Sequence, residues 1–242
     1  MFISNDIPNL IGLRPSIIAS VEKNGYALLR GLYDECAIAE AAKTVYQYAN
    51  SCERLPTAGV KPMDVRRNTS KWSIGGRTFQ DGLPRFALTV YNPQFDADIF
   101  HLRASFDRLI QVRDILAGRE ILRDEALLPT RFNACRVQIY PAGGGFLGEH
   151  RDQRGVSNLP GGCFIEALLL LTQKGLDYRT GGGIIRVNGT AVDPEAGTRR
   201  GDIIVYDGST IHGVLDVDPE LSFDANNLRG RAVALSTIYD NR

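Results

Sequence analysis

The feature that most constrains the fold is a change of character after about residue 130. From there, short runs rich in Val, Ile, Leu and Tyr alternate with turns that contain glycine. These runs occupy 131–140, 163–172, 183–187, 202–206, 212–217 and 231–239. Many short strands separated by glycine- or proline-containing turns are typical of a sandwich or a barrel. The sequence therefore predicts a β-rich core over about 130–240.

The first half of the chain has a mixed pattern that favours helices. We expect helices at 12–24, 34–51 and 96–116, and strands at 25–32 and 86–91. The third helix is indicated by apolar residues at three- and four-residue steps. Residues 53–83 are rich in Gly, Pro and charge, which predicts an irregular segment. We therefore expect one domain over 1–242, in which a helical N-terminal support at about 1–125 braces the β core.

Composition narrows the class of protein. The 242 residues carry 28 basic and 28 acidic side chains, so no basic excess favours nucleic acid as a partner. The longest apolar run, residues 167–171, is far too short to span a bilayer. Residues 1–6 do not resemble a secretion signal, and four cysteines without CxxC pairing fit reduced thiols. We expect a cytoplasmic protein with no nucleic-acid or membrane partner, as a monomer or homodimer.

Two of the three histidines suggest a metal site. If residues 148–152 are extended, His150 and Asp152 project from one face, although a surface polar pair is an equally good interpretation. His212 follows an apolar strand and a tight turn. Two histidines and one carboxylate leave three positions open on a metal, as in non-haem iron(II) oxygenases. The alternative for His212 is a hydrogen-bonded core histidine, and we interpret His101 as structural.

A wider pattern surrounds these residues. Its pieces, in order, are 140–152, 181–185, 201–206, 212–214 and 230–235. Together they resemble the iron(II)/2-oxoglutarate-dependent dioxygenase superfamily, nearest to its prolyl-hydroxylase-like branch; each piece alone is unspecific. The strand expected at 25–32, followed by a helix, also resembles the usual opening of the family. The resemblance implies a mainly β fold with flanking helices, a double-stranded β-helix (jelly roll, cupin-like).

The resemblance also implies a set of ligands. His150, Asp152 and His212 would bind Fe(II), and 2-oxoglutarate and O₂ would be the co-substrates. Arg231 would anchor the distal carboxylate of 2-oxoglutarate, since a guanidinium can grip both oxygens. Residues 218–227 look inserted relative to the family, so Arg229 is the reserve candidate. Tyr140 would contact 2-oxoglutarate or stand near the metal; for either arginine alone, a surface salt bridge is the simpler interpretation.

Substrate contacts are the weakest part of the prediction. Gln138 and Arg136 share the strand face of Tyr140 and would line the barrel mouth, with solvent exposure as an equal alternative. Residues in or beside the irregular segment could form a lid. There Trp72 could stack on substrate, against the alternative of core packing. Arg77 or Arg85 could bind a substrate carboxylate, against the alternative of a solvated arginine.

The implied activity is hydroxylation of an unactivated C–H bond with release of succinate and CO₂. Halogenases of the superfamily have a small residue where Asp152 stands, so hydroxylation is favoured here, with desaturation or cyclisation left open. We expect a small-molecule substrate: a free or N-modified amino acid, or a biosynthetic intermediate. The alternatives are a prolyl or peptidyl hydroxylase, a cupin-like metal-binding module without oxygenase turnover, and a zinc hydrolase.

Overall fold

The structure is a computed structural model that describes residues 1–52, 55–56, 66–74, 83–123, 131–152 and 163–240. These residues form three helices, α1 (Ile7–Asn24), α2 (Glu35–Ser51) and α3 (Arg103–Ala117). The strands of the first half are β1 (Phe2–Ile3), β2 (Tyr26–Arg30), β3 (Leu55–Pro56), β4 (Thr69–Ile74) and β5 (Arg85–Tyr91). Those of the second half are β6 (Arg131–Pro141), β7 (Gly145–His150), β8 (Ile165–Leu170), β9 (Gly182–Val187), β10 (Thr190–Val192), β11 (Ile203–Asp207), β12 (His212–Val217) and β13 (Gly230–Asp240).

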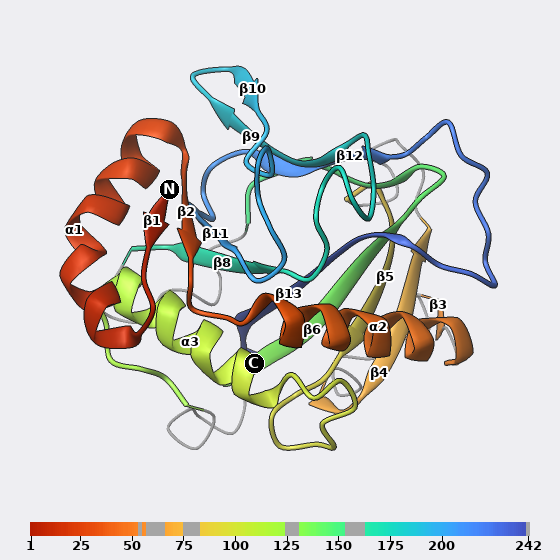
Figure 1. Ribbon diagram of the computed structural model, residues 1–242, viewed down its shortest axis with the longest axis horizontal. Coiled ribbons are helices and arrows are strands. Elements are labelled where there is room, and N and C mark those ends of the chain that lie inside the picture. The colour runs from red at the N-terminus through yellow and green to blue at the C-terminus, as the bar shows by residue number, and fades with distance from the viewer. Residues whose placement is uncertain (53–54, 57–65, 75–82, 124–130, 153–162, 241–242) are drawn as a thin grey trace.

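The strands join into one sheet that turns back on itself. Its order is β1-β2-β11-β8-β13-β6-β5-β7-β12-β9-β10, with β4 paired to β5 and β3 to β4. Because β5 pairs with both β6 and β7, it connects the two layers. In Figure 1, β9 and β12 belong to one layer, and β8 and β13 belong to the layer across the interior. The helices lie on the outer side of the layer that contains β8 and β13. The predicted fold class, a double-stranded β-helix with flanking helices, is confirmed.

Local chemistry explains where the helices begin. Helix α1 begins at Ile7, earlier than predicted, because the Asp6 carboxylate accepts a hydrogen bond from the Asn9 N–H and caps it. Helix α3 begins at Arg103, so the predicted start at residue 96 is wrong. His101 has a left-handed φ of 56°, which a helix does not allow, and Asp98 accepts from the Leu102 N–H just before the helix. His101 therefore precedes the helix.

Strand β4 lies in the segment predicted to be irregular, so that prediction is wrong for residues 69–74. All six of its residues pair antiparallel with β5, from Thr69 opposite Tyr91 to Ile74 opposite Phe86. Thr69 and Ser73 on one face of the strand and Ser70 on the other are all buried, so neither face is fully exposed to solvent. The consequence for the interior is that Lys71 stands beside Thr89 on the same face of the sheet.

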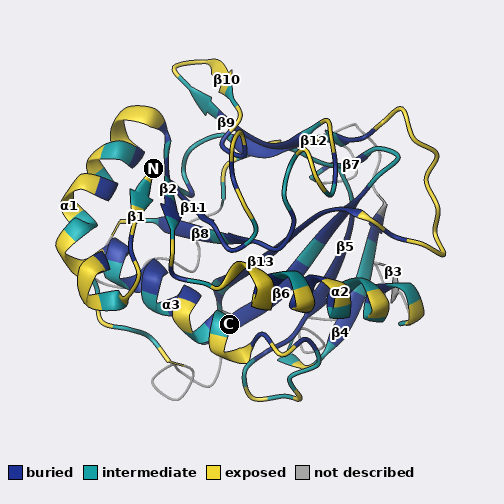
Figure 2. Cartoon of the chain, viewed as in Figure 1, coloured by how far each residue is buried: buried dark blue, intermediate teal, exposed yellow. Residues whose placement is uncertain are grey.

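Two apolar clusters hold the layers together. The larger one joins the buried faces of the three helices to the outer face of the sheet. The smaller one lies inside the jelly roll and includes Tyr140, Tyr206 and Val214. Figure 2 shows the helices buried toward the sheet and exposed on the opposite side. In the parts of the chain that the structure describes, no helix combines the length and the apolar character needed to cross a membrane.

Candidate metal centre

Strand register brings the two histidines together. His150 is the last residue of β7 and His212 the first of β12, and they are direct cross-strand partners. Side chains of such partners project from the same face of a sheet. Asp152 lies just beyond β7, where its N–H donates to the Gly208 carbonyl at 2.9 Å. This backbone bond fixes the chain after β7 against the turn that leads to His212.

The three side chains converge on one point. The Nε2 atom of His150 lies 3.3 Å from Asp152 Oδ1, and Nε2 of His212 lies 3.5 Å from Asp152 Oδ2. One donor atom from each residue can be chosen so that all lie within 4.8 Å of one another. Ligands at right angles on a metal with bonds of about 2.1 Å are roughly 3 Å apart, so the cluster fits a first-row metal ion.

Backbone carbonyls orient both imidazole rings. His150 Nδ1 lies 2.9 Å from the Gly148 carbonyl oxygen, and His212 Nδ1 lies 2.8 Å from the Thr210 carbonyl oxygen. Since a carbonyl only accepts, each Nδ1 carries the proton. Each Nε2 therefore presents its lone pair toward the cluster. A second hydrogen bond of this kind is how metal-binding histidines are usually held.

The charge states also suit a metal. Burial lowers the pKa of His212, which keeps its imidazole neutral and available as a ligand near neutral pH. Burial opposes the charge of Asp152, but the proximity of His150, His212 and Arg136 outweighs it, so its pKa is lowered. At neutral pH His212 thus offers a neutral nitrogen and Asp152 a carboxylate.

The cluster opens into a cavity of about 670 Å³ between the two layers. Arg231, on β13, lines this cavity and is almost fully buried. Its Nε and Nη2 atoms lie 2.8 and 2.5 Å from Oε1 of Glu195, which has no exposed surface. Burial opposes the charge of Glu195, but Arg231 and a hydrogen bond from the Tyr178 hydroxyl outweigh it, so its pKa is lowered.

Two glycines make room for this buried carboxylate. A Cβ atom at Gly182 would lie 2.6 Å from Glu195 Oε2, and one at Gly183 would lie 2.6 Å from Glu195 Oε1. Gly182 also has a φ of 95°, which side-chain-bearing residues rarely adopt. The glycine-rich segment that resembles the family pattern therefore has a specific role here: it admits Glu195 beneath Arg231.

One atom of Arg231 is left without a partner. Its Nη1 is buried and makes no hydrogen bond within the described part of the chain. Its guanidinium lies 5.1 Å from the ring centroid of Tyr140, a buried residue that also lines the cavity. A buried N–H without an acceptor is costly, by about 1–3 kcal/mol, so an anionic ligand such as the distal carboxylate of 2-oxoglutarate fits here. Arg229, the reserve candidate, precedes β13 and is exposed.

The other predicted contact residues divide into three groups. Arg136, Gln138 and Arg85 line the cavity, and Gln138 accepts a hydrogen bond from the Tyr140 hydroxyl at 3.1 Å. Trp72 does not belong to the walls of this cavity as the described residues form it. Instead it stacks on Phe223, from the segment that looked inserted, with ring centroids 5.9 Å apart. Arg77 lies outside the described residues.

Sequence reasoning missed several charged residues of the cavity wall, among them Lys71, Glu166 and Glu195. The only signal for Glu195 was the Gly182–Gly183 pair, since glycines inside a strand often mark the close approach of another group. Lys71 lay in the segment that we predicted to be irregular. Glu166 is a single acid within an otherwise apolar strand, and an apolar run does not indicate which of its two faces borders a cavity.

Comparison with known proteins gives a fold. No protein-family model matches the sequence, and no curated protein matches it. Among solved structures, a prolyl hydroxylase from Trichoplax adhaerens, in complex with a peptide fragment of the hypoxia inducible factor oxygen degradation domain, has a TM-score of 0.54 and 14% identity. The match covers 97% of this chain and 92% of that chain.

Two further solved structures are similar. A prolyl-4-hydroxylase from Pseudomonas putida has a TM-score of 0.53 at 13% identity, over 95% of this chain and 99% of that chain. The non-haem alpha-ketoglutarate-dependent epimerase SnoN from nogalamycin biosynthesis has a TM-score of 0.58 at 14% identity, over 96% of this chain and 86% of that chain. The predicted resemblance is thus confirmed in its structural part: this chain has the fold of the iron(II)/2-oxoglutarate oxygenases.

Proposed function

We propose that this protein is an iron(II)- and 2-oxoglutarate-dependent dioxygenase that hydroxylates an unactivated C–H bond of a small molecule. The substrate is a free or N-modified amino acid or a biosynthetic intermediate, and succinate and CO₂ are released. One observation carries the proposal. The His150–Asp152–His212 cluster and the unpartnered Nη1 of Arg231 line the same cavity, as the two ends of 2-oxoglutarate require.

Each residue has a defined task in this proposal. His150, Asp152 and His212 hold the iron and leave three coordination positions free, and Arg231 orients 2-oxoglutarate through its distal carboxylate. The ring of Tyr140 packs against the guanidinium of Arg231 and helps to hold it in place. Bound iron(II) with 2-oxoglutarate and O₂ supplies the oxidising power for C–H hydroxylation. Solved oxygenases with this fold that contain iron or alpha-ketoglutarate support the same cofactors.

The dimensions of the cavity favour a small molecule. A volume of about 670 Å³ lies within the range of roughly 300–1,000 Å³ that is usual for small-ligand sites. The walls combine apolar side chains such as Leu147 and Leu168 with a few charged ones. This mixture can hold an apolar portion against the wall while charged groups fix its orientation.

The primary test is decarboxylation of 2-oxoglutarate by the purified protein, followed as succinate, with Fe(II) and with Zn(II) as the added metal. We expect succinate with Fe(II) only, at a slow uncoupled rate that a true substrate accelerates. Absence of succinate across a broad panel of amino acids would favour a metal-binding module without turnover. Activity that requires Zn(II) rather than Fe(II) would refute the oxygenase assignment in favour of a hydrolase.

A matched pair of arginine variants tests the anchor. We expect Arg231→Met to raise the 2-oxoglutarate concentration needed for half-maximal succinate formation by roughly tenfold or more, because a charge-assisted contact is lost. Arg229→Met should leave it unchanged, since Arg229 is exposed. If the single Arg231 variant does not fold, the double variant Arg231→Met/Glu195→Leu removes the stranded charge as well. Equal effects at the two arginines would show that Arg231 is not the anchor.

A further inference from the structure

Two cations stand side by side on the cavity wall, away from Arg231. Lys71 Nζ lies 5.3 Å from the ring centroid of Tyr91, and the Arg136 guanidinium lies 5.4 Å from that of Tyr239. The two tyrosine hydroxyls are 3.4 Å apart. Tyr91 and Arg136 are also direct partners between β5 and β6. The cations are therefore held beside each other by aromatic rings.

Within the described residues, neither Lys71 nor Arg136 forms a direct ion pair. Burial opposes the charge of Arg136, but the neighbouring Tyr239 and Tyr91 and the carboxylates of Glu166 and Asp152 outweigh it, so its pKa is raised. The guanidinium of Arg136 donates only to the Ala134 carbonyl at 3.1 Å and the Thr237 hydroxyl at 3.2 Å, although the residue is only 9% exposed. Burial lowers the pKa of Lys71, and the charges of Arg85 and Arg136 lower it further. Buried like charges without a partner are unfavourable unless a ligand neutralises them.

A buried acid, Glu166, lies on the other side of the Thr237 hydroxyl from Arg136. Glu166 is 5% exposed and lines the cavity, and its Oε2 accepts from Thr237 Oγ1 at 3.5 Å. It forms no ion pair within the described part of the chain. Burial, joined by the negative charge of Asp152, raises the pKa of Glu166 to about 7. The Thr237 hydroxyl thus lies between the Arg136 guanidinium and the Glu166 carboxyl group, which attract each other but form no direct ion pair.

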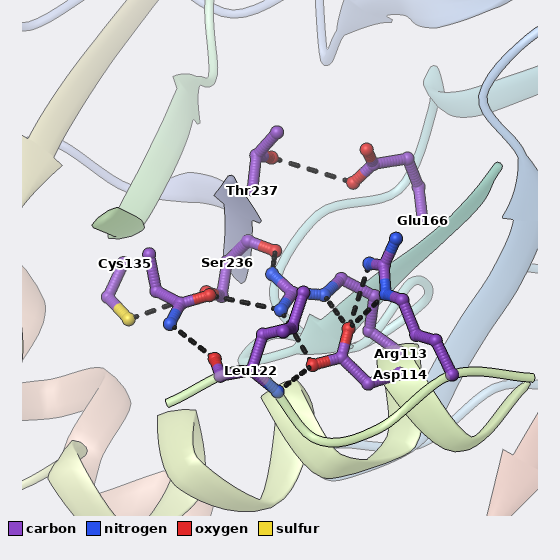
Figure 3. A network of polar contacts seen from close by, with 9 residues as sticks. Arg113, Asp114, Leu122, Cys135, Glu166, Ser236 and Thr237 are labelled. Atoms are coloured by element: carbon purple, nitrogen blue, oxygen red, sulfur yellow. Dashed lines mark hydrogen bonds and ion pairs between the residues drawn. The ribbon is translucent and has the colours of Figure 1, made fainter. Parts of the chain in front are cut away.

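The arginines nearest to Glu166 are already committed elsewhere. Arg113 and Arg119 both bind Asp114, at distances from 2.8 to 3.0 Å. Arg113 also donates to the carbonyl of Ser236. Figure 3 shows this network, with Thr237 and Glu166 at its edge and the dashed contacts of the arginines directed to other groups. Glu166 is therefore available to a ligand in the cavity.

We propose that the cavity binds the zwitterion of a free α-amino acid, with its carboxylate on Lys71 and Arg136 and its ammonium on Glu166. This inference rests on the proposed function and specifies its substrate class. The two charged groups of an α-amino acid are attached to one carbon atom, so they can reach groups that flank a single hydroxyl. An N-acylated amino acid lacks the positive charge that Glu166 requires.

The experiment measures binding rather than turnover. Isothermal titration of the anaerobic Fe(II)–2-oxoglutarate protein with the twenty proteinogenic L-amino acids identifies the tightest ligand. That ligand is then compared with its methyl ester, which lacks the carboxylate charge, and its N-acetyl derivative, which lacks the ammonium. We expect each derivative to bind roughly tenfold to a hundredfold more weakly, because a charge-assisted contact is lost in each.

Single substitutions test which protein side chain binds the carboxylate of the amino acid and which binds its ammonium group. Arg136→Met and Lys71→Met should each weaken binding of the free amino acid by roughly tenfold and leave binding of the methyl ester unchanged. Glu166→Gln should weaken binding of the free amino acid and leave binding of the N-acetyl derivative unchanged. Unchanged binding of the derivative also shows that the variant is folded. Arg186→Met is the matched control, since Arg186 pairs with Glu149 on the surface and should have no effect.

The outcomes separate this inference from the function on which it rests. Uncoupled succinate formation without any amino-acid binding would overturn the inference and leave the oxygenase assignment intact. Amino-acid binding with the expected losses, but no succinate under any condition, would support the ligand class and refute the oxygenase assignment. Equal binding of the free acid, the ester and the N-acetyl derivative would overturn the zwitterion site.

Discussion

Arg231 and Arg136 are both buried, both line the same cavity, and differ in one respect. Arg231 contacts Glu195 through two nitrogens, and its third, Nη1, has no hydrogen-bond partner in the described part of the chain. Among the described residues, the Arg136 guanidinium donates to a carbonyl and a hydroxyl and lies over the Tyr239 ring. The first arginine has a carboxylate in direct contact, whereas the second reaches the carboxylate of Glu166 only through the Thr237 hydroxyl. This difference matches the proposed function, in which a common co-substrate binds at the Arg231 end of the cavity and a specific substrate binds at the Arg136 end.

The electrostatic consequence is a difference in preorganisation. A guanidinium fixed by a buried carboxylate needs little reorganisation to bind an anionic ligand, because its direction is already set. A guanidinium without a carboxylate in direct contact gains more of its stabilisation from the ligand. Removal of Arg231 should therefore destabilise the ligand-free protein strongly, and removal of Arg136 only slightly.

The largest expected effect concerns stability without ligands. Arg231→Met leaves Glu195 charged, buried and without its cation, which should lower the free energy of unfolding by about 3–5 kcal/mol. Arg136→Met removes a cation that repels Lys71 but attracts Glu166 and Asp152, so the two effects partly cancel and the change should stay within about 1 kcal/mol. Denaturant unfolding of both variants measures the difference. Similar losses for the two would remove the contrast.

The second prediction concerns the carboxylate of Glu195, which is the counter-charge of Arg231. Glu195→Gln keeps the shape and an acceptor for Arg231 but removes the negative charge. The free energy of unfolding should fall by about 1–3 kcal/mol, because hydrogen bonds between charged groups become weaker ones. Affinity for 2-oxoglutarate should rise, since the guanidinium is no longer neutralised. Weaker 2-oxoglutarate binding, measured by titration, would show that Glu195 chiefly aims Arg231.

The smallest expected effect is a pH dependence of amino-acid binding, caused by Glu166. Because the pKa of Glu166 is raised to about 7, its carboxyl group is mostly protonated at pH 6 and mostly ionised at pH 8. Affinity for an amino acid with a charged ammonium should therefore increase several-fold from pH 6 to pH 8. The charged and titratable groups that face Glu166 are Asp152, Arg136, Arg113, Arg119 and Tyr206. The arginines stay charged over this interval.

A control separates Glu166 from the metal ligands. Glu166→Gln should bind the amino acid with an affinity that no longer changes over this pH interval. Titration at matched ionic strength and fixed Fe(II) saturation gives the comparison. A pH dependence that persists in the variant would assign it to another group and contradict the role given to Glu166.

The sequence predicted the parts of the molecule that depend on local pattern. The alternation of short apolar runs and glycine-containing turns after residue 130 indicated a β-rich sandwich or barrel, and the resemblance to a known superfamily implied the jelly roll. The spacing of His150 and Asp152 placed two donors on one face of an extended segment. His212 could be joined to them because it begins a strand after a tight turn. These features are confined to a few neighbouring residues, and register then brings the two histidines opposite each other.

The parts that escaped prediction depend on long-range pairing. Glu195 meets Arg231 across 36 positions, and nothing near either residue indicates the other. Lys71 faces the cavity because β4 pairs with β5, and the composition around it suggested an irregular segment. The start of α3 was placed too early because apolar spacing does not report a left-handed residue such as His101. Side chains that share a cavity are predicted only once the strand order is known.

The carbonyl groups of Gly148 and Thr210 have a consequence for how this protein can change. They belong to the main chain, so the tautomer of each ligating histidine does not depend on any neighbouring side chain. Substitutions of side chains on the cavity walls can therefore change the charge and shape of the cavity without changing which nitrogen of each histidine carries the proton. The orientation of the two imidazoles follows from the strand geometry, whereas the charges of Lys71, Arg136 and Glu166 belong to side chains that can be exchanged independently of it.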